Sequence, residues 1–205
     1  ATVTTPKFTL VITKSLPAVS VNLPAGEVEI VGASETADEK AQLPAVTITN
    51  AASTAITGDV TVESVTKGEN YAGEITFDGA VEIPVKTVDI LQEAANNGAA
   101  KILIPKDVTI TLPENSNLIE LNAAALTLDG TIEGPTTGGI FVVPSNHNIN
   151  IDGTGTIKFN YNGDRTETEG NSHAIRAIDI NGGATIKDIT ITSTHQKAGD
   201  AIFCN

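Results

Sequence analysis

Acidic residues and a lysine follow short apolar runs in the second half of the chain, where they could bind a cation or remove a proton. Asp129, Asp152 and Asp188 each come at or just after the end of such a run, and Lys187 precedes Asp188. Carboxylates are ligands that calcium prefers, and a positioned lysine can act as a general base. Asp129 and Asp152 each precede glycine, however, which is typical of a corner. We therefore expect turns here, with a calcium site as the alternative.

A polar segment from residue 160 to residue 172 holds a second set of candidates. Long polar excursions between regular elements often carry binding residues. An aromatic ring in it can stack on a sugar, and the charged side chains around it can hydrogen-bond to hydroxyl groups. The other interpretation is a loop without a role, with Phe159 as a core residue. The candidate ligand-binding residues are Tyr161, Asp164, Arg165, His173 and Arg176.

These candidates lie within a repeat of about two dozen residues. Residues 126–130 recur at 149–153, an offset of 23, and residues 118–121 recur 22 residues later at 140–143. The second series continues after 35 residues at 175–178 and after 27 more at 202–204, so the polar segment is an insertion in one repeat. Short β-branched runs separated by Gly, Asn and Asp predict a β-solenoid, whose stacked turns share one column of aliphatic side chains.

A short amphipathic helix is predicted at residues 88–97, directly before the repeats. Thr87 is a suitable N-cap, and Val88, Leu91 and Ala95 share one face. The open end of a solenoid exposes apolar side chains and unpaired backbone groups. We therefore expect this helix to cover the first turn.

The helix and residues 100–110 together resemble the N-terminal cap and first turn of right-handed parallel β-helix proteins of the pectin-lyase-like superfamily. Residues 182–194 are similar to turns of pectate lyases, polygalacturonases and phage tailspikes. The resemblance covers about residues 86–205 and implies an all-β, right-handed parallel β-helix. It implies no single activity, because the superfamily includes lyases, hydrolases, adhesins and proteins with no known activity.

The resemblance points to two candidate catalytic residues. Only Asp200 matches the motifs of polygalacturonases, and we expect it to be a turn residue before a strand. Pectate lyases use acidic residues to hold calcium and a basic residue to remove a proton. That chemistry would require Lys187 together with Asp129, Asp152 and Asp188 as calcium ligands.

The charge balance limits the partners. The chain has 25 Asp and Glu against 12 Lys and Arg, for a formal net charge of −13. This charge argues against nucleic acid, an anionic membrane or a polyanionic substrate, and favours a neutral polysaccharide or cell-surface glycan, calcium, or no small ligand. The single cysteine, Cys204, excludes an intrachain disulfide and is expected to be buried. The sequence has no membrane-spanning segment and no Met, which favours a processed, secreted or cell-surface protein.

Residues 1–84 carry alternating runs that predict a small β-sandwich-like domain, separate from the β-helix of residues 85–205. The alternative is that they form more solenoid turns. Residues 16–22 resemble residues 43–50 at an offset of 27, as two stacked turns would.

Three functions remain open from the sequence. The first is a non-catalytic, exported or cell-surface β-helix for adhesion or glycan contact. The second is a polysaccharide lyase or glycoside hydrolase, or the N-terminal part of one, and the third is a structural spacer. The last turn, residues 201–204, is expected to be an open edge through which the protein can associate with itself.

Overall fold

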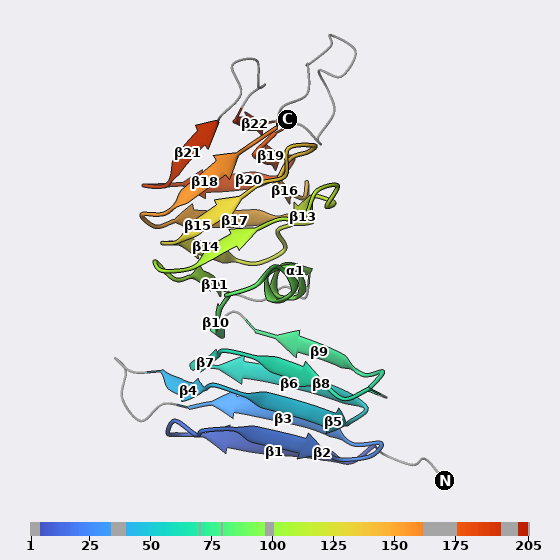
Figure 1. Ribbon diagram of the computed structural model, residues 1–205. Helices are drawn as coiled ribbons and strands as arrows, with labels where there is room; N and C mark the ends of the chain where they lie inside the picture. The colour runs from blue at the N-terminus through green and yellow to red at the C-terminus, as the bar shows by residue number, and fades with distance from the viewer. Residues whose placement is uncertain are drawn as a thin grey trace. The chain divides into compact units, whose positions relative to one another are not determined.

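The strands of this protein are short and stack in parallel (Figure 1). The computed structural model describes residues 5–33, 40–69, 71–78, 80–96, 101–161, 176–193 and 201–204. The chain divides into two compact units, Ala1–Pro84 with Asn97–Lys101, and Val85–Asn96 with Ile102–Asn205. We describe each unit by itself.

The strands of the first unit pair in three series, in the orders β1-β3-β6-β9, β2-β5-β8 and β4-β7-β10. Successive strands of a sheet come from successive passes of the chain, as stacked turns require. The strands are β1 (Lys7–Ile12), β2 (Val19–Asn22), β3 (Glu27–Gly32), β4 (Ala41–Leu43), β5 (Val46–Asn50), β6 (Ser53–Gly58), β7 (Val60–Val62), β8 (Val65–Lys67), β9 (Glu74–Phe77) and β10 (Glu82–Pro84).

The parallel pairing of this unit corrects the prediction of a β-sandwich for residues 1–84. A sandwich of the expected kind is built from antiparallel strands, whereas Lys7 pairs in parallel with Glu27 and Val19 pairs in parallel with Val46. Val19 and Val46 are 27 residues apart, which is the offset from which the alternative interpretation, further solenoid turns, was drawn. Alternation of apolar and polar residues is the same in both kinds of sheet, so the pattern alone could not distinguish them.

The second unit begins with the helix α1 (Val88–Asn96) and continues with strands that also pair in three parallel series. Their orders are β11-β14-β17-β20, β12-β15-β18-β21 and β13-β16-β19-β22. This arrangement is consistent with a β-solenoid. The strands are β11 (Lys101–Ile104), β12 (Thr109–Thr111), β13 (Ile119–Glu120), β14 (Ala125–Leu128), β15 (Thr131–Glu133), β16 (Phe141–Val143), β17 (Asn148–Asp152), β18 (Thr156–Phe159), β19 (Ile178–Ile180), β20 (Gly183–Ile186), β21 (Thr190–Ser193) and β22 (Ile202–Cys204).

Helix α1 is capped as predicted. The backbone amide of Ile90 donates to Thr87 Oγ1 at 3.4 Å, which satisfies one of the free amides of the first turn. The helix buries Leu91, Ala94 and Ala95 and packs beside β13. Val88 is only half-buried, so the apolar face is rotated slightly from the predicted one. The described part of the chain contains no helix long and apolar enough to cross a membrane.

The core of the second unit is a set of aliphatic columns that run from turn to turn. Leu126 pairs with Ile151, which pairs with Ile186. The sequence repeat had aligned Leu126 with Ile149, two residues away. A shift of two residues keeps the same face inward, so the predicted core face is correct although the predicted register is wrong. Likewise, Phe141 pairs with Ile178 and not with Arg176.

Outward side chains also pair between turns. Thr111 on β12 donates to Glu133 on β15 at 3.1 Å, and Lys158 on β18 lies 2.7 Å from the same carboxylate. The hydrogen bonds from Lys158 and Thr111 lower the pKa of Glu133. We call this threonine, acid and lysine series the outer ladder of sheet β12-β15-β18-β21.

Candidate functional site: a polar corner hollow

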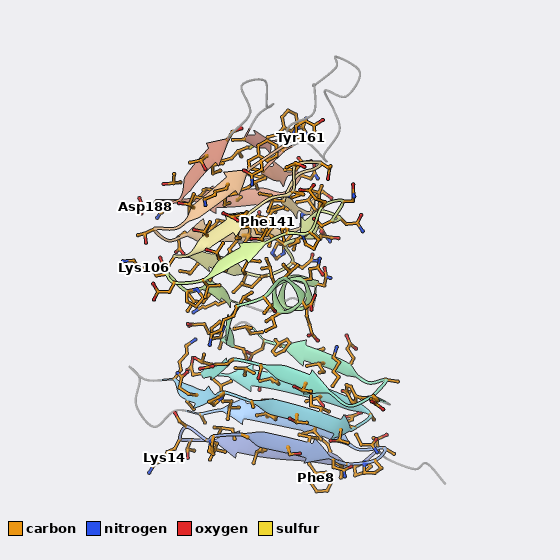
Figure 2. The ribbon with its side chains drawn as sticks, in the orientation of Figure 1. Phe8, Lys14, Lys106, Phe141, Tyr161 and Asp188 are labelled. Atoms are coloured by element: carbon orange, nitrogen blue, oxygen red, sulfur yellow. The ribbon has the colours of Figure 1, made fainter. Side chains whose placement is uncertain are left out.

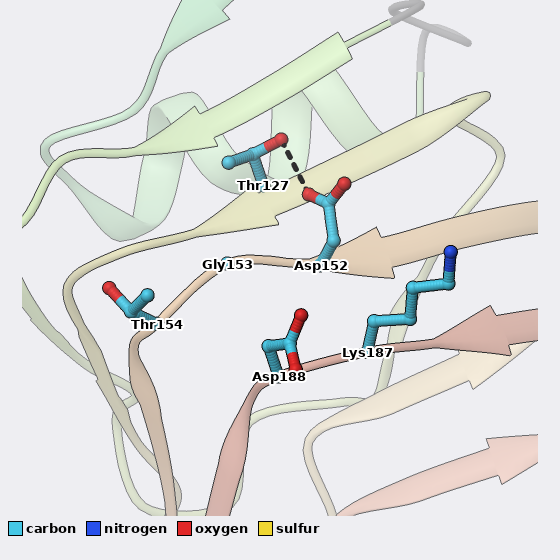
Figure 3. A pocket seen from close by; sticks show the side chains of 6 residues that line it. All are labelled: Thr127, Asp152, Gly153, Thr154, Lys187 and Asp188. Atoms are coloured by element: carbon cyan, nitrogen blue, oxygen red, sulfur yellow. Dashed lines mark hydrogen bonds between the residues drawn. The ribbon is translucent and has the colours of Figure 1, made fainter.

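A polar hollow lies where β14, β17 and β20 end, at one corner of the stacked turns (Figure 3). It is an open depression with a volume of about 350 Å³. We call it the corner hollow, and its lining residues are Thr127, Asp152, Gly153, Thr154, Lys187 and Asp188.

Strand register brings these residues together from three turns. Thr127 pairs with Asp152, the last residue of β17. Lys187 follows β20 directly, and its backbone amide donates to the Ile151 carbonyl at 2.9 Å. The carboxyl ends of parallel strands meet at one edge of a sheet, so the residues that follow them gather there.

The corner itself depends on two residues with positive φ. Gly153 has φ of 119°, and a Cβ at this position would run into the carbonyl oxygen of Leu128. Asp188, in the next turn, has φ of 60°, which aspartate adopts more readily than most residues. These conformations turn the chain sharply after the strands and leave the hollow open between the turns.

Three hydrogen bonds fix part of the lining. Thr127 Oγ1 donates to Asp152 Oδ1 at 2.9 Å. The backbone amide and the hydroxyl of Thr154 both donate to Asp129 Oδ1, at 3.0 and 3.2 Å. Asp129 therefore holds the corner of the next turn, in agreement with the turn role that we preferred for it.

Lys187 and Asp188 are exposed, as are Asp152 and Thr154, but they differ from those two residues in their contacts. Within the described residues, neither side chain forms a hydrogen bond or an ion pair. In the outer ladder, by contrast, Lys158 closes on Glu133. The sheet that carries the hollow repeats the order threonine, acid, lysine, as Thr127, Asp152 and Lys187, but its lysine has no partner among the described residues.

The hollow offers hydroxyl, carboxylate and ammonium groups and no aromatic ring. Among the residues that the structure describes, no three His, Cys, Asp or Glu side chains are placed to hold a metal ion. Asp152 and Asp188 reach the hollow, whereas Asp129 is bonded to Thr154. The arrangement can bind polar groups, and the described residues supply two acidic side chains to the hollow.

The candidates in the predicted insertion are placed differently. Asp164, Arg165 and His173 lie outside the described residues, as does the candidate catalytic residue Asp200. Tyr161 is buried, with 8% exposure, and stacks on Phe159 with ring centroids 6.2 Å apart. One face of its ring is therefore already occupied.

Arg176 is also buried, although we expected it to face a ligand. Its guanidinium lies 3.6 Å from Asp179 Oδ2 and 3.5 Å from the centre of the Phe203 ring. A buried arginine between a carboxylate and an aromatic ring has a structural partner on each side. The spacing of Arg176 and Asp179, three residues apart around the start of β19, was a signal for this pair that we did not use.

Cys204 is exposed, and the prediction that it would be buried is wrong. It ends β22, the last strand of its sheet, so no described turn covers it. The sequence reasoning also missed Thr127 and Thr154 in the hollow. The second of these could have been found, because a threonine directly after the pair Asp152-Gly153 sits at the corner.

No protein-family model, curated protein or solved structure matches this chain. Its fold defines it as a protein of short, stacked parallel strands, consistent with a β-solenoid.

Proposed function

We propose that this protein is an exported or cell-surface β-solenoid that binds a neutral glycan at the corner hollow, without catalysing a reaction. The observation that carries the proposal is a pair of exposed polar side chains, Lys187 and Asp188, which have no partner among the described residues and lie beside the threonine hydroxyls and the Asp152 carboxylate. A sugar hydroxyl both donates and accepts hydrogen bonds. Carboxylates accept them, an ammonium group donates them and threonine does both.

The charge of the protein favours a neutral sugar over an acidic one. The hollow has two carboxylates and one ammonium group, and the whole chain has a formal net charge of −13. A polyanionic glycan would be repelled by both.

We expect weak binding at a single site. About four hydrogen bonds at roughly 1 kcal/mol each give a dissociation constant on the order of 1 mM. The described lining of the hollow has no aromatic ring on which a sugar could stack, so stacking adds nothing to these hydrogen bonds. Useful attachment would therefore need several copies or several contacts along one glycan.

The test is a glycan array, followed by ligand-observed NMR with any neutral oligosaccharide that binds. Lys187→Gln and Asp188→Asn should each reduce binding several-fold, and the asparagine keeps a residue that tolerates positive φ. Lys106→Gln is the matched control, because Lys106 is an exposed lysine in another turn and does not line the hollow. No binding by the parent, or equal loss in the control, would overturn the proposal.

We also propose the finer fold assignment, a right-handed parallel β-helix of the pectin-lyase-like superfamily for residues 86–205. It is supported by a helix that precedes stacked turns and by cross-turn bonds between residues 22 and 25 apart. An experimental structure tests it through the hand of the coil. A left-handed coil would contradict the assignment.

A polysaccharide lyase is the second candidate, because Lys187 lies in the same hollow as Asp152 and Asp188. In that case pectic substrates would give unsaturated products, detected by ultraviolet absorbance, and Lys187→Gln would abolish them. A protein that neither binds glycans nor forms such products would be a spacer.

A further inference from the structure

A column of threonines crosses the sheet β12-β15-β18-β21, with one member on each strand. Register pairs the members in order along the sheet. The residue after each threonine is an isoleucine, and those on β12, β15 and β18 are at most 2% exposed. Successive side chains of a strand point to opposite faces, so the threonines point outward. The members, which we call the threonine column, are Thr109, Thr131, Thr156 and Thr190.

The hydroxyl groups of the threonine column form no hydrogen bond within the part of the chain that the structure describes. Other outward threonines of this unit are engaged, since Thr111 donates to Glu133 and Thr127 donates to Asp152. The two end members of the column are exposed, and the two middle members are half-buried. The column therefore offers a row of hydroxyl groups to a partner.

The corner hollow lies beside this column. Thr154 lines the hollow two residues before Thr156, and Asp188 lines it two residues before Thr190. Thr156 and Thr190 pair directly, so the hollow and the column are neighbours on the same two turns. Figure 2 shows Asp188 and Tyr161 on opposite sides of the second unit, so a glycan in the hollow does not meet the Tyr161 ring.

The spacing and chemistry of the column suit a polymer of sugars. Neighbouring strands lie about 4.8 Å apart, so the column repeats one hydroxyl group at that interval over roughly 14 Å. A linear glycan likewise repeats its hydroxyl groups from sugar to sugar, and each can donate to threonine or accept from it. Next to the column, Lys158 and Glu133 pair at 2.7 Å and balance each other's charge. A face of this kind favours a neutral polymer over a charged one.

We infer that the occupant of the corner hollow is an extended, unbranched neutral glycan whose further sugars run along the threonine column, across the strands. The inference rests on the proposed function, because the hollow must first bind a neutral glycan. A branch would meet the outer ladder on one side of the column and the corner on the other. The column supplies the several contacts along one glycan that a weak single site needs for attachment.

The experiment compares chain lengths on the full chain. The probes are the disaccharide, tetrasaccharide and hexasaccharide of linear glucose, mannose, xylose and galactose oligomers, titrated against protein with labelled threonine methyl groups and followed by NMR. In a series that binds, the dissociation constant should fall about tenfold from the disaccharide to the hexasaccharide. The methyl signals of Thr109 and Thr131 should shift with the hexasaccharide and stay in place with the disaccharide.

Variants separate the column from the hollow, with circular dichroism to confirm that each is folded. Thr131→Val removes a hydroxyl group and keeps the branched shape of the side chain. It should weaken hexasaccharide binding several-fold and leave disaccharide binding unchanged, whereas Lys187→Gln should weaken both. Thr76→Val is the matched control, because Thr76 is an exposed threonine on β9 that pairs with Ala55, outside the threonine column. It should bind both lengths as the parent does.

The outcomes distinguish this inference from the proposed function. If the disaccharide binds through Lys187 and the hexasaccharide binds no more tightly, the hollow remains a glycan site and the inference is wrong. Equal weakening of both lengths by Thr131→Val would also overturn it, because the hydroxyl group would then act through the structure of the hollow. If none of the four series binds, both proposals fail.

Discussion

Thr127 Oγ1 donates a 2.9 Å hydrogen bond to Asp152 Oδ1, although the two residues are 25 apart in the sequence. The bond joins outward side chains of two stacked turns, directly above the aliphatic column that runs through Leu126 and Ile151. One register thus places both the core of the protein and the lining of the corner hollow.

This hydrogen bond should make a small but measurable contribution to stability. In a double-mutant cycle of Thr127→Ala and Asp152→Ala, we expect a coupling free energy of about 0.5 kcal/mol, typical of paired side chains on a sheet surface. Chemical denaturation of the parent, the two single variants and the double variant measures it. Strictly additive losses would show that the two groups act independently.

Gly153→Ala should destabilise the protein by about 1–3 kcal/mol, because alanine is strained at φ of 119° and its Cβ would meet the Leu128 carbonyl oxygen. The comparison is Asp188→Gly in the equivalent corner of the next turn. There glycine accepts the positive φ without strain, so we expect little change. Equal losses in both variants, measured by denaturant titration, would mean that backbone conformation is not the cause.

Two truncations to alanine in the aliphatic column of β1 and β3 should differ strongly in how much they lower the free energy of unfolding. Ile30→Ala removes a fully buried side chain and should cost about 2–5 kcal/mol. Leu10→Ala, in the adjacent turn, removes a side chain that is 41% exposed and should cost about 1 kcal/mol or less. Chemical denaturation of the two variants and the parent measures both costs. Similar costs would contradict the stacking of Leu10 on Ile30.

Stability should fall in acid partly through Glu133. Its pKa in the folded protein is below the ordinary value of 4.5, because Lys158 and then Thr111 donate hydrogen bonds to the carboxylate. The stabilisation is therefore complete above the unfolded value and is lost as the pH falls through the folded value. Glu133→Gln should show a weaker decline in stability from about pH 5 to pH 3 than the parent. Glu120→Gln removes another outward carboxylate and is the control, and an identical profile for both variants would exclude the role of Glu133.

The sequence predicted those features that depend on local chemistry and on periodicity. Thr87 caps α1 because a hydroxyl before a helix satisfies a free amide, and this can be read from one segment. The inward face of β14 and β17 was also predictable, because alternation defines the face whatever the register. Asp129 could be interpreted as a corner from the glycine that follows it.

The features that the sequence did not predict depend on contacts between segments that are distant in the chain. Antiparallel and parallel strands share the same alternation, so Val19 and Val46 did not by themselves reveal their parallel pairing. Burial of Tyr161 and Arg176 results from contacts with Phe159, Asp179 and Phe203, and the composition of the segment indicated an exposed binding loop instead. The hollow could not be derived, because it requires three turns in the correct register and two corners with positive φ.

The pairing of β18 with β21 and of β16 with β19 has a practical consequence. Thr156 pairs with Thr190 and Phe141 with Ile178, so the ladders continue although one turn is longer than its neighbours by roughly a dozen residues. Chain length between β18 and β19 is therefore decoupled from the register of the stack. Residues added between these two strands should therefore leave the pairing of the strands unchanged, because added loop length costs little entropy.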